Sequence, residues 1–155
     1  MKNKTQKIHY RQGDVLLQRV DSLPKELVTI AREEGRVILA HGEVTGHAHA
    51  ITDAGTDLLQ ASNGDQFVRV CGRPIKSRLK ILRAWRGQVL VQHPKLGVMQ
   101  FAIDDITVRD GTAEISGEFA LLKHDEHATQ AVPAGTYRNV RQREYSPEEI
   151  RRVAD

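Results

Sequence analysis

The sequence predicts a mainly β fold, a single-domain β-barrel or β-sandwich with a short C-terminal helix. Three observations predict it. Short apolar segments recur along the chain, turn-forming Gly, Asp, Asn or Pro residues interrupt them about every eight to twelve residues, and long helical periodicity is nearly absent. The 155 residues are enough to bury one core. We therefore predict one domain over residues 1–155, with residues 1–8 as a flexible N-terminal segment.

Apolar stretches between turns place the individual strands. Gly-containing segments that tolerate positive φ separate several of them and permit hairpins. The predicted strands are 14–20, 36–40, 47–52, 57–61, 66–70, 79–85, 88–93, 98–103, 107–109, 113–122 and 137–145.

Two further segments have patterns of their own. Residues 24–34 mix apolar and charged side chains, which is compatible with a helix or an edge strand. At the C-terminal end, Ser146 is a capping residue, Pro147 suits the first helical position and Glu149 completes a capping box. This pattern predicts the short C-terminal helix.

Composition bounds the cellular location. Cys71 is the only cysteine, which excludes an intrachain disulfide and a zinc site built from several thiolates of one chain. The sequence has no apolar run of about 18 residues or more, and the basic residues 1–7 are not followed by an apolar stretch of signal-peptide type. We therefore expect a soluble, cytoplasmic protein with no membrane partner.

Histidines are the clearest functional signal. Five of the seven fall into two groups with acidic residues between them. The members are His41, Glu43, His47 and His49 in the first group and His124, Asp125, Glu126 and His127 in the second. On a strand, His47 and His49 project from one face, close enough for both imidazoles to reach one ion.

The second histidine group follows the apolar residues 119–122, at a predicted exit from a strand into a loop. His124 and His127 are three positions apart, so they share a face only if the chain turns there. With such a turn they complete a three-ligand site that leaves an open coordination position for water. Nitrogen and oxygen ligands favour a divalent zinc, iron, nickel or manganese ion, and two histidines with one carboxylate would suit non-haem iron.

These patterns predict a metal site and a set of catalytic residues. The predicted metal ligands are His47, His49, His124 and His127, with His41 as a further candidate. Glu126 is predicted as the general base or as an acid that orients a metal ligand, and His124 and His127 are also candidates for catalysis. Such a site favours a metal-dependent hydrolase that acts on an anionic, phosphodiester-type substrate.

Basic residues predict where an anionic partner would bind. The net charge is only +3, but the segment 73–86 holds six basic residues and no acid. Within it, Arg78 and Lys80 are predicted to point outward, where they would contact an anion or prevent edge-to-edge aggregation. Alternation in the strand 137–145 places a further set on one face, suited to phosphates and nucleic-acid bases or else simply solvated. This set is Tyr137, Asn139, Arg141, Arg143 and Tyr145.

Rival interpretations of the same residues stay open. One is a metal-free nuclease in which histidines act as general acid and base, since their ordinary pKa is close to neutral. Another is a non-catalytic nucleic-acid or protein-binding module that uses the strand 137–145. A third is a structural protein that forms homo-oligomers, and a purely structural role for the histidines is also compatible with the sequence.

Three segments carry a resemblance to known proteins. They are Gly46-His47-Ala48-His49, His124-Asp125-Glu126-His127, and residues 133–145 beginning Pro-Ala-Gly-Thr-Tyr. With them the chain resembles a group of small uncharacterised bacterial and bacteriophage-associated proteins. That resemblance implies no known activity.

The first histidine motif also resembles the cupin family, in which a Gly precedes His-x-His on a β-barrel and a distant histidine completes a metal site. Gly42, His47 and His49 match this pattern, and His124 or His127 would be the distant ligand. The chain departs from cupins because no Glu follows at the expected distance and the later Pro-x-Gly-x-x-His motif is missing. The resemblance implies an architecture that is cupin-like at most.

Overall fold

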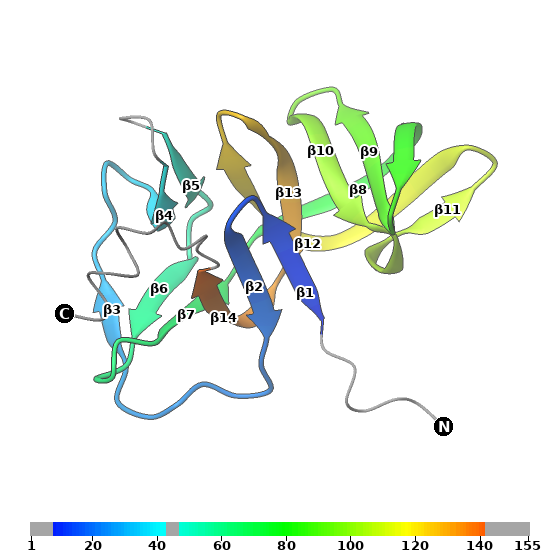
Figure 1. Ribbon diagram of the computed structural model, residues 1–155. Coiled ribbons are helices and arrows are strands. Elements are labelled where there is room, and N and C mark those ends of the chain that lie inside the picture. The colour runs from blue at the N-terminus through cyan, green and yellow to red at the C-terminus, as the bar shows by residue number, and fades with distance from the viewer. Residues whose placement is uncertain (1–7, 43–46, 142–155) are drawn as a thin grey trace.

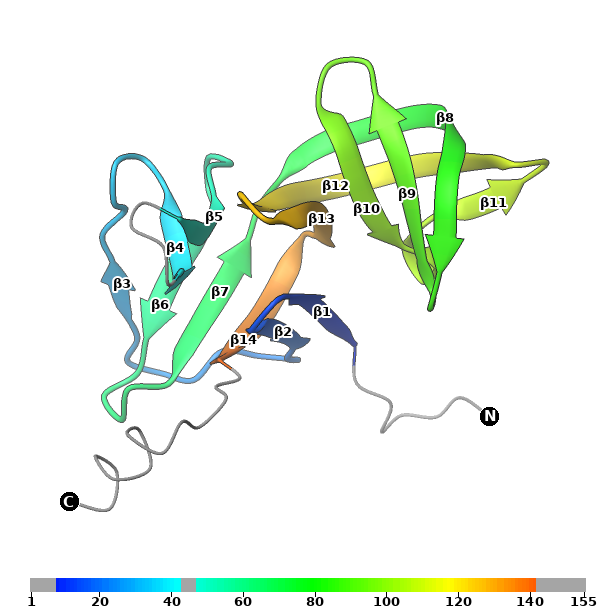
Figure 2. The ribbon, with the colours of Figure 1, turned by 45° about the horizontal axis from the view of Figure 1, so that its top comes forward.

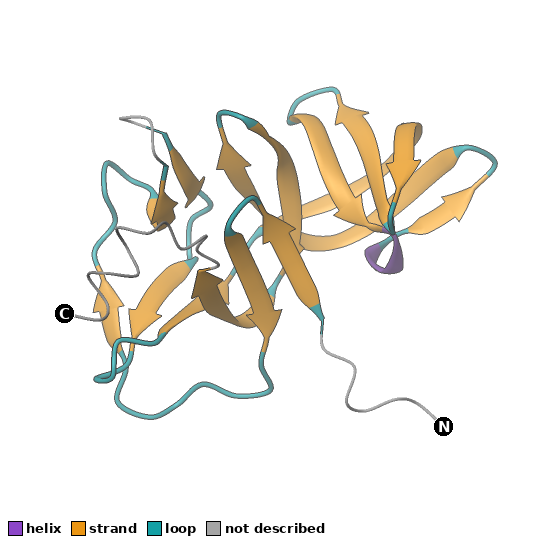
Figure 3. Ribbon diagram, viewed as in Figure 1, coloured by secondary structure: helices purple, strands orange, loops and turns teal. Residues whose placement is uncertain are grey.

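Strands make up nearly all of the regular structure (Figure 1; Figure 3). The computed structural model describes residues 8–42 and 47–141, and in these ranges the only helix is the single 3₁₀ turn η1 (Ile103–Asp105). The predicted mainly β fold class is therefore confirmed, while the predicted C-terminal helix falls outside the described ranges. Within those ranges, no helix is long and apolar enough to span a membrane.

The first sheet contains six strands, and every neighbouring pair in it is antiparallel. It brings both ends of the described chain together, because the second strand pairs with the last. In spatial order the strands are β1 (His9–Gln12), β2 (Val15–Arg19), β14 (Gly135–Arg141), β7 (Gln66–Val70), β6 (Asp57–Gln60) and β3 (Val28–Ile30).

The second sheet contains eight strands and closes partly on itself. Its members are β4 (Val37–His41), β5 (Ala48–Ile51), β8 (Arg73–Trp85), β9 (Gln88–His93), β10 (Gly97–Ala102), β11 (Thr107–Arg109), β12 (Thr112–His124) and β13 (His127–Pro133). Strand β13 pairs with β12 on one side and, in parallel, with β10 on the other. The pairings β10–β9, β9–β8 and β8–β12 complete a closed ring (Figure 2).

Two buried clusters correspond to these two parts. The first core includes Leu17, Val68 and Tyr137 from the six-stranded sheet, and the second includes Val91 and Phe101 from the ring. Strand β12 supplies both, because alternate side chains of a strand point to opposite faces. Ala120 and Leu122 enter the first core, whereas Phe119 and Leu121 enter the second. The continuous apolar run 119–122 is thus explained by burial on both faces.

A close backbone approach fixes where β12 crosses the start of β8. Gly72 lies directly against the main chain of Phe119 and Ala120, where any Cβ atom would overlap it. Nearby, the Asp53 carboxylate accepts a hydrogen bond from the Leu121 N–H (2.9 Å) and one from Arg73 Nε (2.7 Å). Through the buried Asp53 carboxylate, the β5–β6 connection is bound both to β12 and to the half-exposed Arg73 at the start of β8.

The predicted strands correspond to observed ones with small shifts at their ends. The bounds 66–70, 88–93 and 107–109 agree with β7, β9 and β11, whereas β8 begins six residues earlier than predicted, at Arg73 rather than Leu79. The ambiguous segment 24–34 contains the edge strand β3 and no helix. Strands β1 and β13 were not predicted, although β13 carries His127 and β1 contacts His49 through Gln12.

Candidate metal centre

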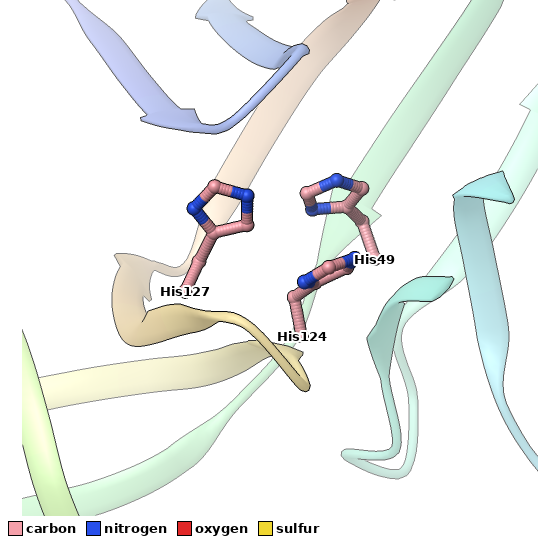
Figure 4. Close-up of side chains that lie close together, drawn as sticks. All are labelled: His49, His124 and His127. Carbon is pink, nitrogen blue, oxygen red and sulfur yellow. The ribbon is translucent and has the colours of Figure 1, made fainter. Parts of the chain in front are cut away.

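Three histidines from three strands meet at one point between the two sheets. His49 lies on β5, His124 ends β12 and His127 begins β13, and one ring nitrogen from each lies within 4.8 Å of the others (Figure 4). His49 is buried, His124 half-buried and His127 exposed. These three imidazoles could hold a metal ion, with solvent access on the His127 side.

A tight hairpin brings His124 and His127 together. They are cross-strand partners in the β12–β13 pairing, and Asp125 and Glu126 form the two-residue turn between them. The turn that their spacing required is therefore present. The His124 ring stacks on His49 with ring centroids 4.2 Å apart, and the centroids of His124 and His127 are 4.8 Å apart.

Gln12 fixes the position of the proton on His49. The Gln12 side-chain amide donates to the carbonyl oxygens of Leu122 (2.8 Å) and Ala128 (2.9 Å), so its oxygen must face the His49 ring. That oxygen lies 2.9 Å from His49 Nδ1, which therefore carries the proton and donates. His49 Nε2 then keeps its lone pair, and a buried residue orients it as in many metal-binding histidines.

His124 has the opposite arrangement. Its Nδ1 accepts a hydrogen bond from the backbone N–H of Glu126 at 3.0 Å, so the neutral ring carries its proton on Nε2. If Nδ1 bound a metal, its lone pair would no longer be available to Glu126. If Nε2 bound the metal, the proton would have to move to Nδ1. Either mode of ligation therefore breaks the Glu126 hydrogen bond.

Two glycines border the histidines. Gly13, in the β1–β2 turn, has φ +55°, and a Cβ atom there would lie 2.8 Å from His127 Nε2 and 3.0 Å from His49 Cε1. At the opposite side, a Cβ on Gly42 would lie 3.1 Å from His47 Cβ and 3.4 Å from His124 Nε2. Both positions let backbone approach the rings more closely than a side chain would permit.

The environment lowers the pKa of two of the three histidines, His49 and His124. Burial, together with the neighbouring His124 and His127, lowers the pKa of His49 to about 4, and Asp14 opposes this shift. Burial also lowers the pKa of His124, with a contribution from His127 and against the acids Asp125 and Glu126. Neutral imidazole is the form that binds metal, so His49 stays competent well below pH 7.

His47 lies next to the triad. Its ring packs edge-on against His124 with centroids 6.1 Å apart, so both His47 and His49 contact the His124 ring. Its Nε2 is 3.0 Å from Asp125 Oδ2 and its Nδ1 is 3.7 Å from Glu126 Oε2. The two turn acids therefore contact His47. The group of three possible ligands includes neither these acids nor His47, which we had predicted as a ligand.

His41 lies on β4 and makes a different contact. Its Nε2 is 3.5 Å from Glu33 Oε2, and both side chains are exposed. The group of three possible ligands does not include it.

The predicted face of strand 137–145 is oriented differently from our expectation. Tyr137 and Asn139 do share a face, but that face is buried, with relative exposures of 0% and 7%. The Tyr137 hydroxyl donates to the Pro133 carbonyl (2.6 Å) and accepts from Arg19 (2.9 Å). The prediction that Tyr137 stacks on nucleic-acid bases is wrong for this conformation, because its ring is part of the first core.

The remaining predicted anion-binding residues are only partly described. Arg143, Tyr145 and the side chain of Arg141 lie outside the described part of the chain. Arg78 and Lys80 do project from the outer face of β8 as predicted, and Arg78 pairs with Glu114 at 3.5 Å. Neither is part of the histidine cluster, so their proposed role in anion binding stays a prediction.

Sequence reasoning missed Gln12 and Gly13. Both sit in β1 and its turn, between the predicted flexible segment 1–8 and the first predicted strand, 14–20. The only local signal is a Gln-Gly-Asp turn after the pattern His9-Tyr10-Arg11-Gln12, in which Tyr10 and Gln12 are buried and their neighbours exposed. A buried glutamine 37 residues away from its histidine partner cannot be paired with it from spacing alone.

The fold and site together define a two-sheet β protein with a three-histidine cluster. A family model described as a domain of unknown function (DUF8820) matches residues 11–74. The matched segment contains Gln12, Gly13 and His49 but neither His124 nor His127. The match fits the resemblance to a family without an assigned function and brings no activity with it. No curated protein and no solved structure matches the chain.

Proposed function

We propose that the chain binds one divalent metal ion through His49, His124 and His127 and is a metal-dependent hydrolase for an anionic, phosphodiester-type substrate. The observation that supports this most is the convergence of three ring nitrogens within 4.8 Å, beside a glutamine that holds His49 in a ligating tautomer. A three-histidine site with one open position is the arrangement of zinc enzymes that activate water.

The donor set favours zinc over non-haem iron. The cluster contains three imidazoles, whereas the iron site we considered needs a carboxylate in place of one of them. Nitrogens bound to tetrahedral zinc at 2.0–2.1 Å lie about 3.4 Å apart, so the rings need to approach one another slightly on binding. The exposed His127 can move for this purpose, because its side chain faces solvent.

The chemistry follows from the site's openness and its acids. A bound zinc ion would lower the pKa of a coordinated water toward neutrality and so supply a nucleophile. We propose Glu126 as general base or orienting acid, since it lies in the turn between two ligands and 3.7 Å from His47. Asp125 Oδ2 lies 3.0 Å from His47 Nε2 and would orient this imidazole for proton transfer.

The decisive experiment is elemental analysis of untagged protein, with His49→Ala and His47→Ala variants of confirmed fold. We expect near-stoichiometric metal in the parent and in His47→Ala, and none in His49→Ala. The reason is that His49 is one of the three proposed ligands, whereas His47 is not. A parent that binds no metal after incubation with zinc, manganese, nickel and ferrous iron would sink the proposal.

Turnover then separates the rival interpretations. Hydrolysis that a chelator abolishes and added zinc restores supports the metal-dependent enzyme. Cleavage that persists in the metal-free protein and is lost in His47→Ala favours the acid–base nuclease. Binding of nucleic acid without cleavage, unchanged in both variants, favours the non-catalytic module.

A further inference from the structure

An open cleft adjoins the histidine cluster on its exposed side. It has a volume of about 350 Å³ and lies between β1 of the first sheet and the strands β9, β10 and β13 of the ring. His127 lines one part of it, together with Gln12 and Gly13 from the wall of the metal centre. A ligand in this cleft would therefore touch the residues that border the proposed metal.

The cleft is cationic. Arg11 and Arg86 line it with His9, and none of the described residues that line it is acidic. Arg11 and His9 alternate with the buried Tyr10 and Gln12, so the pleat of β1 turns both toward the solvent side. Arg86 lies in the tight turn between β8 and β9, which a hydrogen bond from the Ile103 N–H to the Gly87 carbonyl (2.8 Å) holds against η1. Such a lining favours an anion.

The cleft also offers an aromatic ring and amide groups. Trp85 lines it as a half-buried side chain, and the Arg83 guanidinium sits over the Trp85 ring at 4.6 Å from its centroid. Gln88 and Gln100 add amide groups that can hydrogen-bond a base edge, although Gln100 Nε2 also donates to Gln130 Oε1 at 2.9 Å. Arginines beside an aromatic ring are the combination that binds single-stranded nucleic acid, through phosphate contacts and base stacking.

We propose that this cleft binds a nucleotide unit of single-stranded nucleic acid, with the phosphate beside Arg11 and Arg86 and the base against Trp85. The cleft volume lies within the usual range of about 300–1,000 Å³ for small-molecule sites. The inference deepens the proposed function, because a nucleotide held here would direct its neighbouring phosphodiester toward His127. Binding in the cleft itself does not require the metal.

The single tryptophan of the chain makes the test direct. Because Trp85 is the only one and lines the cleft, its fluorescence reports occupancy there. We would titrate the full-length, chelator-treated protein with the dinucleotide pTpT, and with thymidine and inorganic phosphate separately, while following the anisotropy of a labelled oligothymidylate in parallel. We expect a saturable fluorescence change with pTpT, and binding about tenfold weaker or more for either fragment.

Arg86→Gln is the informative variant and Arg109→Gln its matched control, since both remove one exposed cation but only Arg86 lines the cleft. Loss of a phosphate contact in Arg86→Gln should raise the Kd for pTpT about tenfold, whereas Arg109→Gln should stay within about twofold of the parent. Arg11→Gln should resemble Arg86→Gln. Equal effects of Arg86→Gln and Arg109→Gln, or no saturable change in either signal, would overturn the inference.

The two proposals fail in different ways. If pTpT binds His49→Ala as well as the parent, while elemental analysis finds no metal in the parent, the cleft proposal is supported and the hydrolase proposal is overturned. If zinc binds stoichiometrically and neither signal responds to pTpT, the metal centre stands and the nucleotide cleft falls.

Discussion

His49 combines burial with a hydrogen bond that fixes the proton on its Nδ1. Burial, with the neighbouring His124 and His127, lowers its pKa from the ordinary value of 6.5 to about 4. The ring is therefore neutral throughout the physiological range, with its free lone pair on Nε2 beside two further imidazoles. As a metal ligand, His49 would therefore face little competition from protons. The same lowered pKa reduces the stability of the fold at low pH.

The first prediction concerns that cost. Between pH 6.5 and 4 the unfolded chain protonates His49 while the folded metal-free protein does not, so the free energy of unfolding falls as pH decreases. At about 1.4 kcal/mol per pH unit, the loss attributable to His49 reaches about 3 kcal/mol near pH 4. Urea unfolding at a series of pH values measures it. In His49→Asn the decrease over this window should be clearly smaller, and an unchanged decrease would contradict the assigned cause.

A second prediction concerns Gln12. The Gln12→Met variant keeps the length of the side chain but removes the acceptor for His49 Nδ1 and the donors for Leu122 and Ala128. Removing an orienting partner of this kind should weaken zinc binding about 10- to 100-fold. Competition against a chromogenic chelator measures the affinity, and circular dichroism confirms the fold. Unchanged affinity in folded Gln12→Met would show that Gln12 does not orient His49.

A third prediction follows from His124. Because either ring nitrogen must give up the Glu126 N–H on ligation, added zinc should move the backbone amide resonance of Glu126 in a two-dimensional NMR spectrum. The chain contains a matched control, since His93 Nδ1 accepts the N–H groups of Lys95 (3.0 Å) and Leu96 (3.1 Å) in another hairpin. Those two amides should not move. A Glu126 resonance unaffected by stoichiometric zinc would exclude His124 as a ligand.

At this scale the sequence identified the histidines but not their partners. The pairing of His47 with His49, and of His124 with His127, follows from periods of two along a strand and three around a turn. The choice of His49 rather than His47 for the cluster depends on how β5 packs against β12. Gln12 was not predictable, because its hydrogen bond to Leu122 joins residues 110 positions apart.

Among the elements, the β1–β2 turn has the strictest requirement. Gly13 adopts positive φ and leaves no room for a Cβ beside His127 and His49. Gly13→Ala should therefore displace the exposed His127 ring and reduce metal affinity, with a destabilisation of about 1 kcal/mol from the backbone conformation. Metal content and thermal melting measure the two effects.

Gly111→Ala is the control for Gly13→Ala. Gly111 also has positive φ, at +76°, but a Cβ there would meet nothing within 4 Å. It should lose stability to a similar degree and keep its metal. If both variants lose metal alike, the steric explanation for Gly13 is wrong.

Predictable and unpredictable elements differ in a physical way. Strands such as β7 and β9 have apolar runs bounded by turn residues, so their bounds could be predicted. Strand β13 begins with His127 and Ala128, which carry little β preference. It is held by pairing to β12 and β10. Strand β1 is short and largely polar, and its buried positions are evident only once the opposite strands are in place.

At the scale of the whole molecule, β12 and β13 couple the two cores. Leu121 is buried in the second core and Leu122 in the first, and Ala131 and Val132 of β13 divide in the same way. Tyr10 of the first sheet also donates to Asp105 of η1 at 2.9 Å. If β12 detached from one core, the apolar side chains that it contributes to the other core would be exposed as well.

We therefore predict one cooperative unfolding transition. Denaturant curves followed by Trp85 fluorescence report on the closed ring of strands, and curves followed by far-UV circular dichroism report on both sheets. The two sets of curves should coincide. Leu121→Ala should lower the free energy of unfolding by about 2–5 kcal/mol and shift both curves together. Two separated transitions would contradict the prediction of a single domain over residues 1–155.

The hydrogen bond between Gln12 and Leu122 also has a kinetic consequence. Loops that close over so many residues lose much chain entropy, and folds dominated by such distant pairings fold on the millisecond-to-second scale. During synthesis, a nascent chain ending at residue 74 would carry Gln12 and His49 without either histidine of the β12–β13 hairpin. Metal binding by all three imidazoles, as we propose it, would thus be a late event, available only to chains whose two sheets have already docked.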